Sequence, residues 1–215
     1  MIKAVIFDLD GTTLNTIEDL QNSMNIILRR YKMEETTREK MISYLGRGAR
    51  NLIKDHFSKQ TSEETIDKIA SEFVEVYSSN YNVYTKPYDG IYELLIELQR
   101  QGIIIAVNSN KPNAFCEKLM SSHFPKIKFE IIIGQRKGIP IKPDPYSLNK
   151  IIEKLNINKN EVIYIGDSES DVMTAKNAGV QIIGCAWGFR GFEALKQAGA
   201  DIVISSPKEL LEYID

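Results

Sequence analysis

Two acidic residues follow the first apolar run of the chain. Residues 2–7 are almost all apolar and lead directly into Asp8, with Asp10 and Gly11 close behind. In open α/β sheets, ligands bind beyond the carboxyl ends of the strands, where the strand order reverses. An acid at the end of a buried strand therefore projects into a site and not into the core. A surface loop of solvated acids is the alternative, but a run that is apolar at both odd and even positions indicates a central strand.

A second acidic pair follows a later apolar run. Asp167 comes directly after residues 162–166, and Asp171 lies one helical turn further along the same face. The alternative is a helix cap, because Ser168 and Asp171 have the spacing of a capping box. Capping alone leaves unexplained why two buried strands both end in aspartate.

Charge repulsion between these acids points to a metal ion. Two carboxylates about 4 Å apart repel by roughly 4 kcal/mol at an effective dielectric constant of about 20. Gathering Asp8, Asp10, Asp167 and Asp171 at one edge of a sheet is therefore tolerable only with a cation between them. Oxygen ligands alone favour a hard ion, and we expect Mg²⁺. The two histidines stand apart in the sequence and indicate no zinc site.

Anion-binding groups follow two other predicted strands. Ser109 and Asn110 come after residues 103–107, and Lys142 precedes a predicted helix. A hydroxyl and backbone N–H groups at a helix N-terminus can seat an anion, and a lysine adds a cation beside it. Helix and turn caps are the alternatives, with Ser109, Asn110 or Asp144 as the capping residue. Together with paired carboxylates and a hard metal, these groups are the equipment for phosphoryl transfer.

The elements that must position these residues alternate along the chain. Short β-branched runs predict strands over residues 2–7, 103–107, 129–133, 162–165, 181–185 and 201–204. Apolar residues at three–four spacing between them predict helices, as in Ile91, Leu94, Leu95 and Leu98. The fold class is therefore α/β, with a doubly wound parallel sheet and a Rossmann-like core.

One stretch breaks the alternation. Residues 15–85 contain only helical periodicity, which is far more chain than a crossover between parallel strands needs. We interpret this stretch as an all-helical cap inserted into a catalytic core of residues 1–14 and 86–215. The hinges are expected near Asn15 and near Lys86.

Composition excludes several classes of function. The 215 residues contain 27 Lys and Arg against 29 Asp and Glu, and a net charge of −2 does not suit a nucleic-acid-binding surface. No apolar run approaches the roughly 18 residues of a membrane span. Cys116 and Cys185 are too far apart in the sequence to suggest a disulfide scaffold or a zinc site. We expect a cytoplasmic protein that acts on a small molecule.

Four segments together resemble the motifs of the haloacid dehalogenase superfamily. They are Asp8-Leu-Asp-Gly-Thr12, Ser109, Lys142 in Lys-Pro-Asp-Pro, and Gly166-Asp-Ser-x-x-Asp171, in the family's order. The helical insertion after the first segment resembles the C1 cap of the phosphoglycolate phosphatase-like branch. The resemblance implies a Mg²⁺-dependent phosphatase that hydrolyses a small phosphorylated metabolite.

The resemblance also implies roles for individual residues. Asp8 would be the nucleophile that becomes an aspartyl phosphate, and Asp10 would protonate the leaving alcohol and then deprotonate the attacking water. Ser109 and Lys142 would bind the phosphoryl oxygens. The predicted metal ligands are Asp8, Asp10 through its backbone carbonyl, Asp167 and, in an assisting role, Asp171.

Substrate preference is expected to depend on the cap. Arg47 and Arg50 lie in a glycine-containing turn and could pair with a carboxylate or a second phosphate, although solvated arginines at helix ends are the alternative. Thr12 and Asn110, which stand beside motif residues, are also predicted to bind substrate, and Arg190 is a lesser candidate.

Three other functions remain open at this point. Within the superfamily, a phosphosugar mutase of the β-phosphoglucomutase type or a pyrophosphatase would use similar residues. Outside it, a phosphoacceptor signalling module also places acids, a hydroxyl and a lysine at the edge of a sheet, but such modules lack a helical insertion. Thr13 and Asn15 depart from the residues usual in the family, which leaves substrate preference open.

Overall fold

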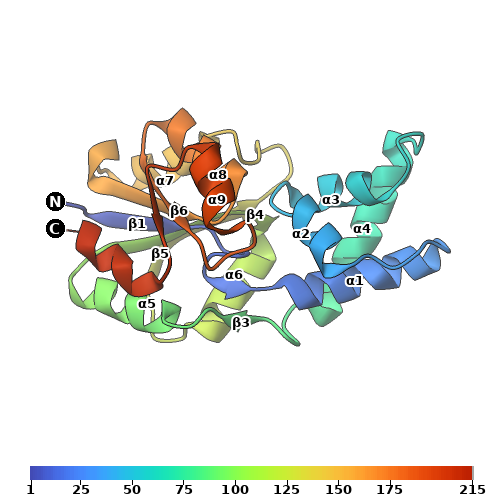
Figure 1. Cartoon of the computed structure of the whole chain (residues 1–215), viewed down its shortest axis with the longest axis horizontal. Coiled ribbons are helices and arrows are strands. Elements are labelled where there is room, and N and C mark those ends of the chain that lie inside the picture. The colour runs from blue at the N-terminus through green and yellow to red at the C-terminus, as the bar shows by residue number, and fades with distance from the viewer. Residues whose placement is uncertain (215) are drawn as a thin grey trace. The chain divides into compact units, whose positions relative to one another are not determined.

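The computed structural model describes residues 1–214 and divides into two compact units. The core unit comprises Met1–Asn15 and Pro87–Asp215, and the helical unit comprises Thr16–Lys86. The chain passes between them through two short strands, β2 (Leu14–Asn15) and β3 (Lys86–Pro87), which form a separate two-stranded sheet. Figure 1 colours the chain by residue number, so both crossings can be followed.

The core unit is built on a parallel sheet. Its strands are β1 (Ala4–Phe7), β4 (Ile104–Pro112), β5 (Phe129–Gln135), β6 (Val162–Gly166), β7 (Gln181–Cys185) and β8 (Ile202–Ile204). The strand order is β5-β4-β1-β6-β7-β8, and every pairing given for neighbouring strands is parallel. This order reverses between β1 and β6, which confirms the predicted doubly wound α/β core. Each of the six predicted runs forms one of these strands.

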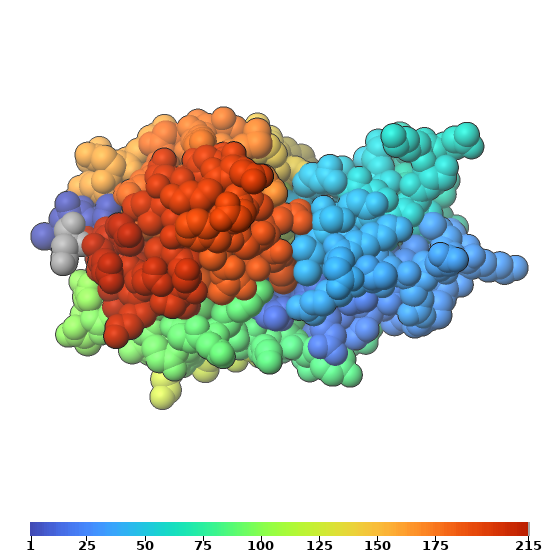
Figure 2. Space-filling model, in the orientation of Figure 1, coloured from blue at the N-terminus to red at the C-terminus, as the bar shows by residue number. Residues whose placement is uncertain are grey.

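Helices cover the sheet of the core unit. They are α5 (Ile91–Arg100), α6 (Asn113–His123), α7 (Tyr146–Leu155), α8 (Glu169–Ala178) and α9 (Gly191–Ala198), with 3₁₀ turns at Lys159–Glu161 and Pro207–Tyr213. Helices α7, α8 and α9 pack in sequence against one another, whereas α5 packs on β4 and on the last 3₁₀ turn. The residues of β1 are completely buried. In the space-filling view of Figure 2, orange and red atoms of the C-terminal part of the chain form much of the visible surface of the core unit.

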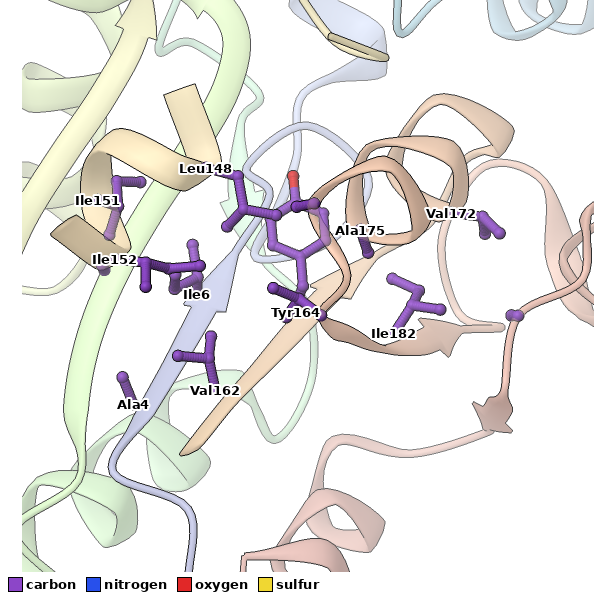
Figure 3. Packing of buried hydrophobic residues seen from close by; sticks show 14 of the residues in the cluster. Ala4, Ile6, Leu148, Ile151, Ile152, Val162, Tyr164, Val172, Ala175 and Ile182 are labelled. Carbon is purple, nitrogen blue, oxygen red and sulfur yellow. The ribbon is translucent and has the colours of Figure 1, made fainter. Parts of the chain in front are cut away.

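Side-chain parity explains why the central strands are apolar throughout. Ile6 of β1 and Tyr164 of β6 join a buried cluster with Leu148 of α7 and Val172 of α8 (Figure 3). Because successive side chains of a strand point to opposite faces, the residues between them serve the other face. Both faces are covered, so both parities must be apolar.

Strand β4 extends further than its apolar residues predict. It continues through Pro112, and α6 begins only at Asn113 with no side-chain cap. Ser109 and Asn110 therefore do not cap this helix, and the capping alternative for them is wrong. Asn108 pairs with Ile133 and Pro112 pairs with Gln135, so three residues of β4 face one residue of β5 in a bulge.

The helical unit contains α1 (Ile17–Arg30), α2 (Arg38–Tyr44), α3 (Gly48–His56) and α4 (Glu63–Asn80). Its helices bury apolar faces against one another, and α1 packs on α4. The buried carboxylate of Asp19 accepts hydrogen bonds from the N–H groups of Val83, Tyr84 and Thr85 and thereby fixes the segment after α4. No helix among residues 1–214 is both long and apolar enough to cross a membrane.

Candidate active site

The predicted acids meet at the carboxyl ends of the two central strands. Asp8 follows β1, Asp167 follows β6, and Asp171 lies in the first turn of α8. One carboxylate oxygen from each of the three lies within 4.8 Å of those of the other two. All three side chains are buried, Asp171 completely. The strand order reverses between β1 and β6, and in open α/β sheets ligands bind beyond the strand ends at that point.

Burial of these acids makes their charges costly. Desolvation raises the pKa of Asp8 to about 7, although the ammonium of Lys142 lowers it. Desolvation also raises the pKa of Asp167 well above its usual value, and the charges of Asp171 and Asp8 raise it further. Burial is the largest cause of both shifts, because it disfavours the charged form of a carboxyl group.

The donor set fits a divalent, oxygen-preferring cation. Acidic and basic side chains in and beside the cluster supply four carboxylates against two ammonium groups: Asp8, Asp10, Asp167 and Asp171 with Lys111 and Lys142. When all are ionised they leave two negative charges, which one divalent ion would neutralise. Carboxylate oxygens without sulfur or imidazole suit Mg²⁺.

Lys142 is the cation closest to Asp8. Its Nζ atom lies 2.8 Å from Asp8 Oδ1 and 2.6 Å from Asp171 Oδ1. Burial lowers the pKa of Lys142, but the negative charges of Asp171 and Asp8 outweigh burial and hold it well above its usual value. Lys142 therefore stays charged beside the predicted nucleophile, as its predicted role in binding phosphoryl oxygens requires.

Asn110 holds the backbone of Lys142 on both sides. Its Oδ1 atom accepts from the Lys142 N–H at 2.8 Å, and its Nδ2 group donates to the Lys142 carbonyl at 3.1 Å. Asn110 is predicted from the sequence to bind substrate. The observed contacts favour a different role, in which the Asn110 amide positions Lys142.

Both oxygens of Asp171 already have protein partners. Oδ1 accepts from Lys142 and, at 3.1 Å, from the hydroxyl of Tyr164, while Oδ2 accepts from the N–H and hydroxyl of Ser168. The capping box at the start of α8 is therefore present as well. With its oxygens engaged in this way, Asp171 is better placed to hold Lys142 than to act as the metal ligand predicted from sequence.

Asp10 stands apart from the three clustered acids and has its own cation. Its Oδ1 atom lies 2.9 Å from Nζ of Lys111, whose side chain is almost fully buried. Ser109, two residues before Lys111, is buried and its hydroxyl accepts from the Lys111 N–H at 3.3 Å. The bulge in β4 brings Ser109, Asn110 and Lys111 inward together, which a regular strand with alternating side chains could not do.

The loop after β7 contacts Asp167 and the segment that follows Asp8. The N–H of Phe189 donates to Asp167 Oδ2 at 2.7 Å, and the indole N–H of Trp187 donates to the Thr12 carbonyl at 3.0 Å. Gly188 lies so close that an added Cβ would stand 2.3 Å from Asp167 Cβ. This loop therefore fixes the orientation of Asp167.

Other predicted site residues have local partners. Thr12 is completely buried and its hydroxyl accepts from the Cys185 thiol at 3.6 Å; its role in substrate binding stays a prediction. Arg190 pairs with Glu169 at 3.1 Å.

The two cap arginines have partners within the helical unit. Arg47 pairs with Asp55, and Arg50 pairs with Glu63 and Asp67. Their role in substrate binding stays a prediction.

Sequence analysis missed three contributors to the site. Lys111 follows Asn108, Ser109 and Asn110 in a polar run, and its place in that run predicts no role for it. Tyr164 has the signal of a core strand residue, because its ring is in the core and only its hydroxyl reaches Asp171. The Phe189 N–H is a backbone group, for which side-chain type carries no signal. The polar run itself was the one available sign of Lys111.

Comparison with known proteins agrees with this geometry. The family model of haloacid dehalogenase-like hydrolases matches residues 5–185. A phosphoglycolate phosphatase from Vibrio parahaemolyticus is 30% identical over 99% of this chain and 96% of its own length. An N-acetylmuramic acid 6-phosphate phosphatase from Pseudomonas aeruginosa is 27% identical over 100% of this chain and 95% of its own.

A solved structure shows the same similarity in three dimensions. It is a provisionally assigned phosphoglycolate phosphatase from Lactobacillus delbrueckii subsp. bulgaricus, 29% identical with a TM-score of 0.86, covering 99% of this chain and 98% of the other. The chain has a parallel sheet with aspartates at the ends of its two central strands, and the family model matches residues 5–185. The chain therefore belongs to the haloacid dehalogenase-like hydrolases. Within them it is a phosphatase that hydrolyses phosphoric monoesters.

Proposed function

We propose that this phosphatase is Mg²⁺-dependent and hydrolyses a small phosphorylated metabolite through an aspartyl phosphate on Asp8. The observation that carries the proposal is the position of Asp8, which lies in the buried acidic cluster with Lys142 Nζ 2.8 Å from its carboxylate. A buried carboxylate beside a fixed ammonium can approach a phosphoryl group whose oxygens the ammonium binds.

The reaction proceeds in two displacements. In the first, a carboxylate oxygen of Asp8 forms a bond to phosphorus, the bond from phosphorus to the ester oxygen breaks, and Asp10 gives its proton to the leaving alcohol. In the second, a water oxygen attacks phosphorus as Asp10 takes a proton from that water, and the bond to Asp8 breaks. Inorganic phosphate leaves, and both aspartates return to their starting state.

The chain's own residues supply most of the binding. Lys142 and Ser109 bind phosphoryl oxygens, and Asp171 and Asn110 keep Lys142 in place. Asp8, Asp167 and the backbone carbonyl of Asp10 would hold Mg²⁺. Bound there, the ion would neutralise charge on the phosphoryl group and the carboxylates, so that two anions can approach each other.

The substrate class is proposed from the relatives. Their names give phosphoglycolate and N-acetylmuramic acid 6-phosphate as substrates, each a phosphate monoester of an acid. We therefore take 2-phosphoglycolate as the first candidate, with Arg47 or Arg50 as candidate partners for the carboxylate.

Three measurements test the proposal. A panel of phosphorylated metabolites, assayed with and without Mg²⁺, should show phosphate release only with the metal. Asp8→Asn should lower turnover by at least about 10³-fold, because the nucleophile is lost, while circular dichroism shows an intact fold. Acid quenching of the unmutated enzyme with labelled substrate should trap a phosphoprotein, and the Asp8→Asn variant should trap none.

The products separate the competing reactions. Free phosphate from a monoester supports the proposal. An isomerised sugar phosphate would indicate a mutase, phosphate only from pyrophosphate would indicate a pyrophosphatase, and a long-lived phosphoprotein without turnover would indicate a signalling module. Retained hydrolysis in Asp8→Asn would remove Asp8 as the nucleophile.

A further inference from the structure

Lys111 is a buried lysine to which the proposed reaction assigns no role. Its side chain is 2% exposed, yet it carries a charge that burial makes costly unless a partner offsets it. The partner is the Asp10 carboxylate, 2.9 Å away and itself 21% exposed. The two residues are a hundred positions apart in the chain, so tertiary structure alone brings them together.

The bulge in β4 is what delivers Lys111 to Asp10. Three residues of β4 there face the single residue Gly134 of β5. Gly134 allows this close approach, since an added Cβ would lie 2.6 Å from the Lys111 carbonyl oxygen and 2.6 Å from Asn113 Cα. The N–H of Lys111 bonds to Ser109 and its carbonyl accepts from the Cys116 thiol, so the backbone that carries the ammonium is held on both sides.

We propose that Lys111 is a positioning residue that holds the Asp10 carboxylate in the orientation for proton exchange with the leaving alcohol and the attacking water. The inference rests on the proposed function, in which Asp10 performs both transfers. Asp10 follows the strand end, and the Lys111 ammonium lies 2.9 Å from its carboxylate, close enough to set the direction in which that carboxylate points. A proton donor contributes only when it is within hydrogen-bond reach of the reacting oxygen, and a small displacement is enough to remove the contribution.

Lys142 cannot replace Lys111 in this role. Its Nζ atom already lies between Asp8 and Asp171, at 2.8 and 2.6 Å. The two lysines therefore divide the acids between them, one serving the nucleophile and the other serving the proton carrier. A direct role for Lys111 in binding a substrate carboxylate is the competing assignment, and the choice of substrates separates the two.

The test uses two aryl phosphates of similar size that carry no carboxylate. Phenolate is a poorer leaving group than p-nitrophenolate and depends more on protonation by Asp10. Lys111→Met keeps most of the apolar stem and removes the charge. We expect kcat/KM to fall about tenfold or more for phenyl phosphate and several-fold less for p-nitrophenyl phosphate. The exposed Lys154→Met serves as the control and should change neither value.

A double-mutant cycle measures whether Lys111 acts through Asp10. In an Asp10→Asn background, Lys111→Met should cause little further loss with p-nitrophenyl phosphate, because the group it positions is absent. Full additivity of the two losses would overturn the proposal. Unchanged activity of Lys111→Met toward both aryl phosphates would also overturn it, as would a loss confined to KM for 2-phosphoglycolate, which would assign Lys111 to the substrate carboxylate.

Failure of the inference and failure of the proposed function look different. If Asp10→Asn alone keeps full activity toward phenyl phosphate, the proton-transfer role of Asp10 is wrong. If Asp10→Asn is inactive toward phenyl phosphate and Lys111→Met is not impaired, only the role of Lys111 is wrong. Circular dichroism and thermal unfolding of each variant show whether the fold is retained. If Lys111→Met unfolds, Lys111→Gln, which keeps a hydrogen-bond donor, provides a second test. Its kcat/KM should also fall more for phenyl phosphate than for p-nitrophenyl phosphate.

Discussion

The buried amide of Asn110 is uncharged, yet it positions the charged side chain of Lys142. It accepts from the Lys142 N–H and donates to the Lys142 carbonyl. The backbone from which the Lys142 side chain extends toward Asp8 and Asp171 is therefore fixed. Buried backbone groups that lose such partners are costly, because no water replaces them.

We therefore expect Asn110→Ala to damage both stability and turnover. The free energy of unfolding should fall by about 1–3 kcal/mol, since two buried backbone groups lose their partner. The kcat for the best substrate should fall about tenfold, because the Lys142 ammonium is no longer held. Chemical denaturation and steady-state kinetics measure the two effects.

A matched control lies in α8, next to the segment that carries Lys142. The exposed Asn177 donates to the Pro143 carbonyl at 3.0 Å, and Asn177→Ala should change neither quantity appreciably. If Asn110→Ala instead raised KM alone and left stability and kcat intact, Asn110 would bind substrate as the sequence indicated.

At the level of single residues, chemical type predicted the acids well and the polar neighbours poorly. Asp8, Asp167 and Lys142 stand at strand or loop ends, where position along the chain already indicates which way a side chain points. Asn110 and Lys111 lie inside a bulge, where the alternation of a strand is interrupted. The contacts that such residues make depend on the neighbouring strand, which their own sequence does not describe.

Among the elements, the loop after β7 makes close contacts with Asp167, one of the acids proposed to bind Mg²⁺. Phe189 orients Asp167 through its backbone N–H, and Gly188 leaves no space between the loop and the carboxylate. An alanine Cβ at position 188 would stand 2.3 Å from Asp167 Cβ and 2.5 Å from the Gly11 carbonyl oxygen. Neither neighbour is the end of a flexible side chain, so both would have to move.

Gly188→Ala should therefore weaken Mg²⁺ binding by about tenfold or more, because a metal site tolerates little displacement of its carboxylates. Isothermal titration calorimetry with MgCl₂ alone measures the affinity without reference to activity. Gly138→Ala is the control: it introduces a side chain at a positive φ of 80°, with nothing within 4 Å of the added Cβ. Equal Mg²⁺ affinity in Gly188→Ala and the unmutated protein would show that this loop does not orient Asp167.

The positions of the elements were predicted more accurately than their ends. The six strands of the parallel sheet and helices α5 to α8 follow from apolar periodicity, because burial on one or both faces imposes it, whereas α9 was not predicted. The end of β4 did not follow, since the polar residues of Ser109–Lys111 look like a loop when read alone. Their pairing to β5 through the bulge is a property of two strands together.

For the molecule as a whole, the buried acids link folding, metal binding and pH. The pKa of Asp8 rises from 3.8 to about 7 in the folded state without metal. Between these values the folded state binds more protons than the unfolded state, so the stability of the metal-free protein falls as pH rises from about 4 to 7. Mg²⁺ competes with those protons, and its stabilising effect should grow over the same interval.

Thermal unfolding with EDTA and with excess Mg²⁺ checks this expectation. At a free Mg²⁺ concentration of 100 times its dissociation constant, the gain in stability is about 2.7 kcal/mol. The difference in Tm between the two conditions should be larger at pH 7 than at pH 5. The difference in Tm between EDTA and Mg²⁺ should be smaller in Asp8→Asn, which has lost a charged ligand. An equal difference in Tm at pH 5 and pH 7 in the unmutated protein would contradict the linkage between protons and Mg²⁺.

The sequence alone determined the alternation of strands and helices, the inserted helical stretch and the acids at the ends of two buried strands. These features are local, because burial dictates periodicity within each segment and a strand end exposes the residue that follows it. Only the tertiary structure decided which charges meet. Lys111 reaches Asp10, Lys142 lies between Asp8 and Asp171, and the Phe189 N–H orients Asp167, because partners distant in the chain are brought together by sheet order and loop packing.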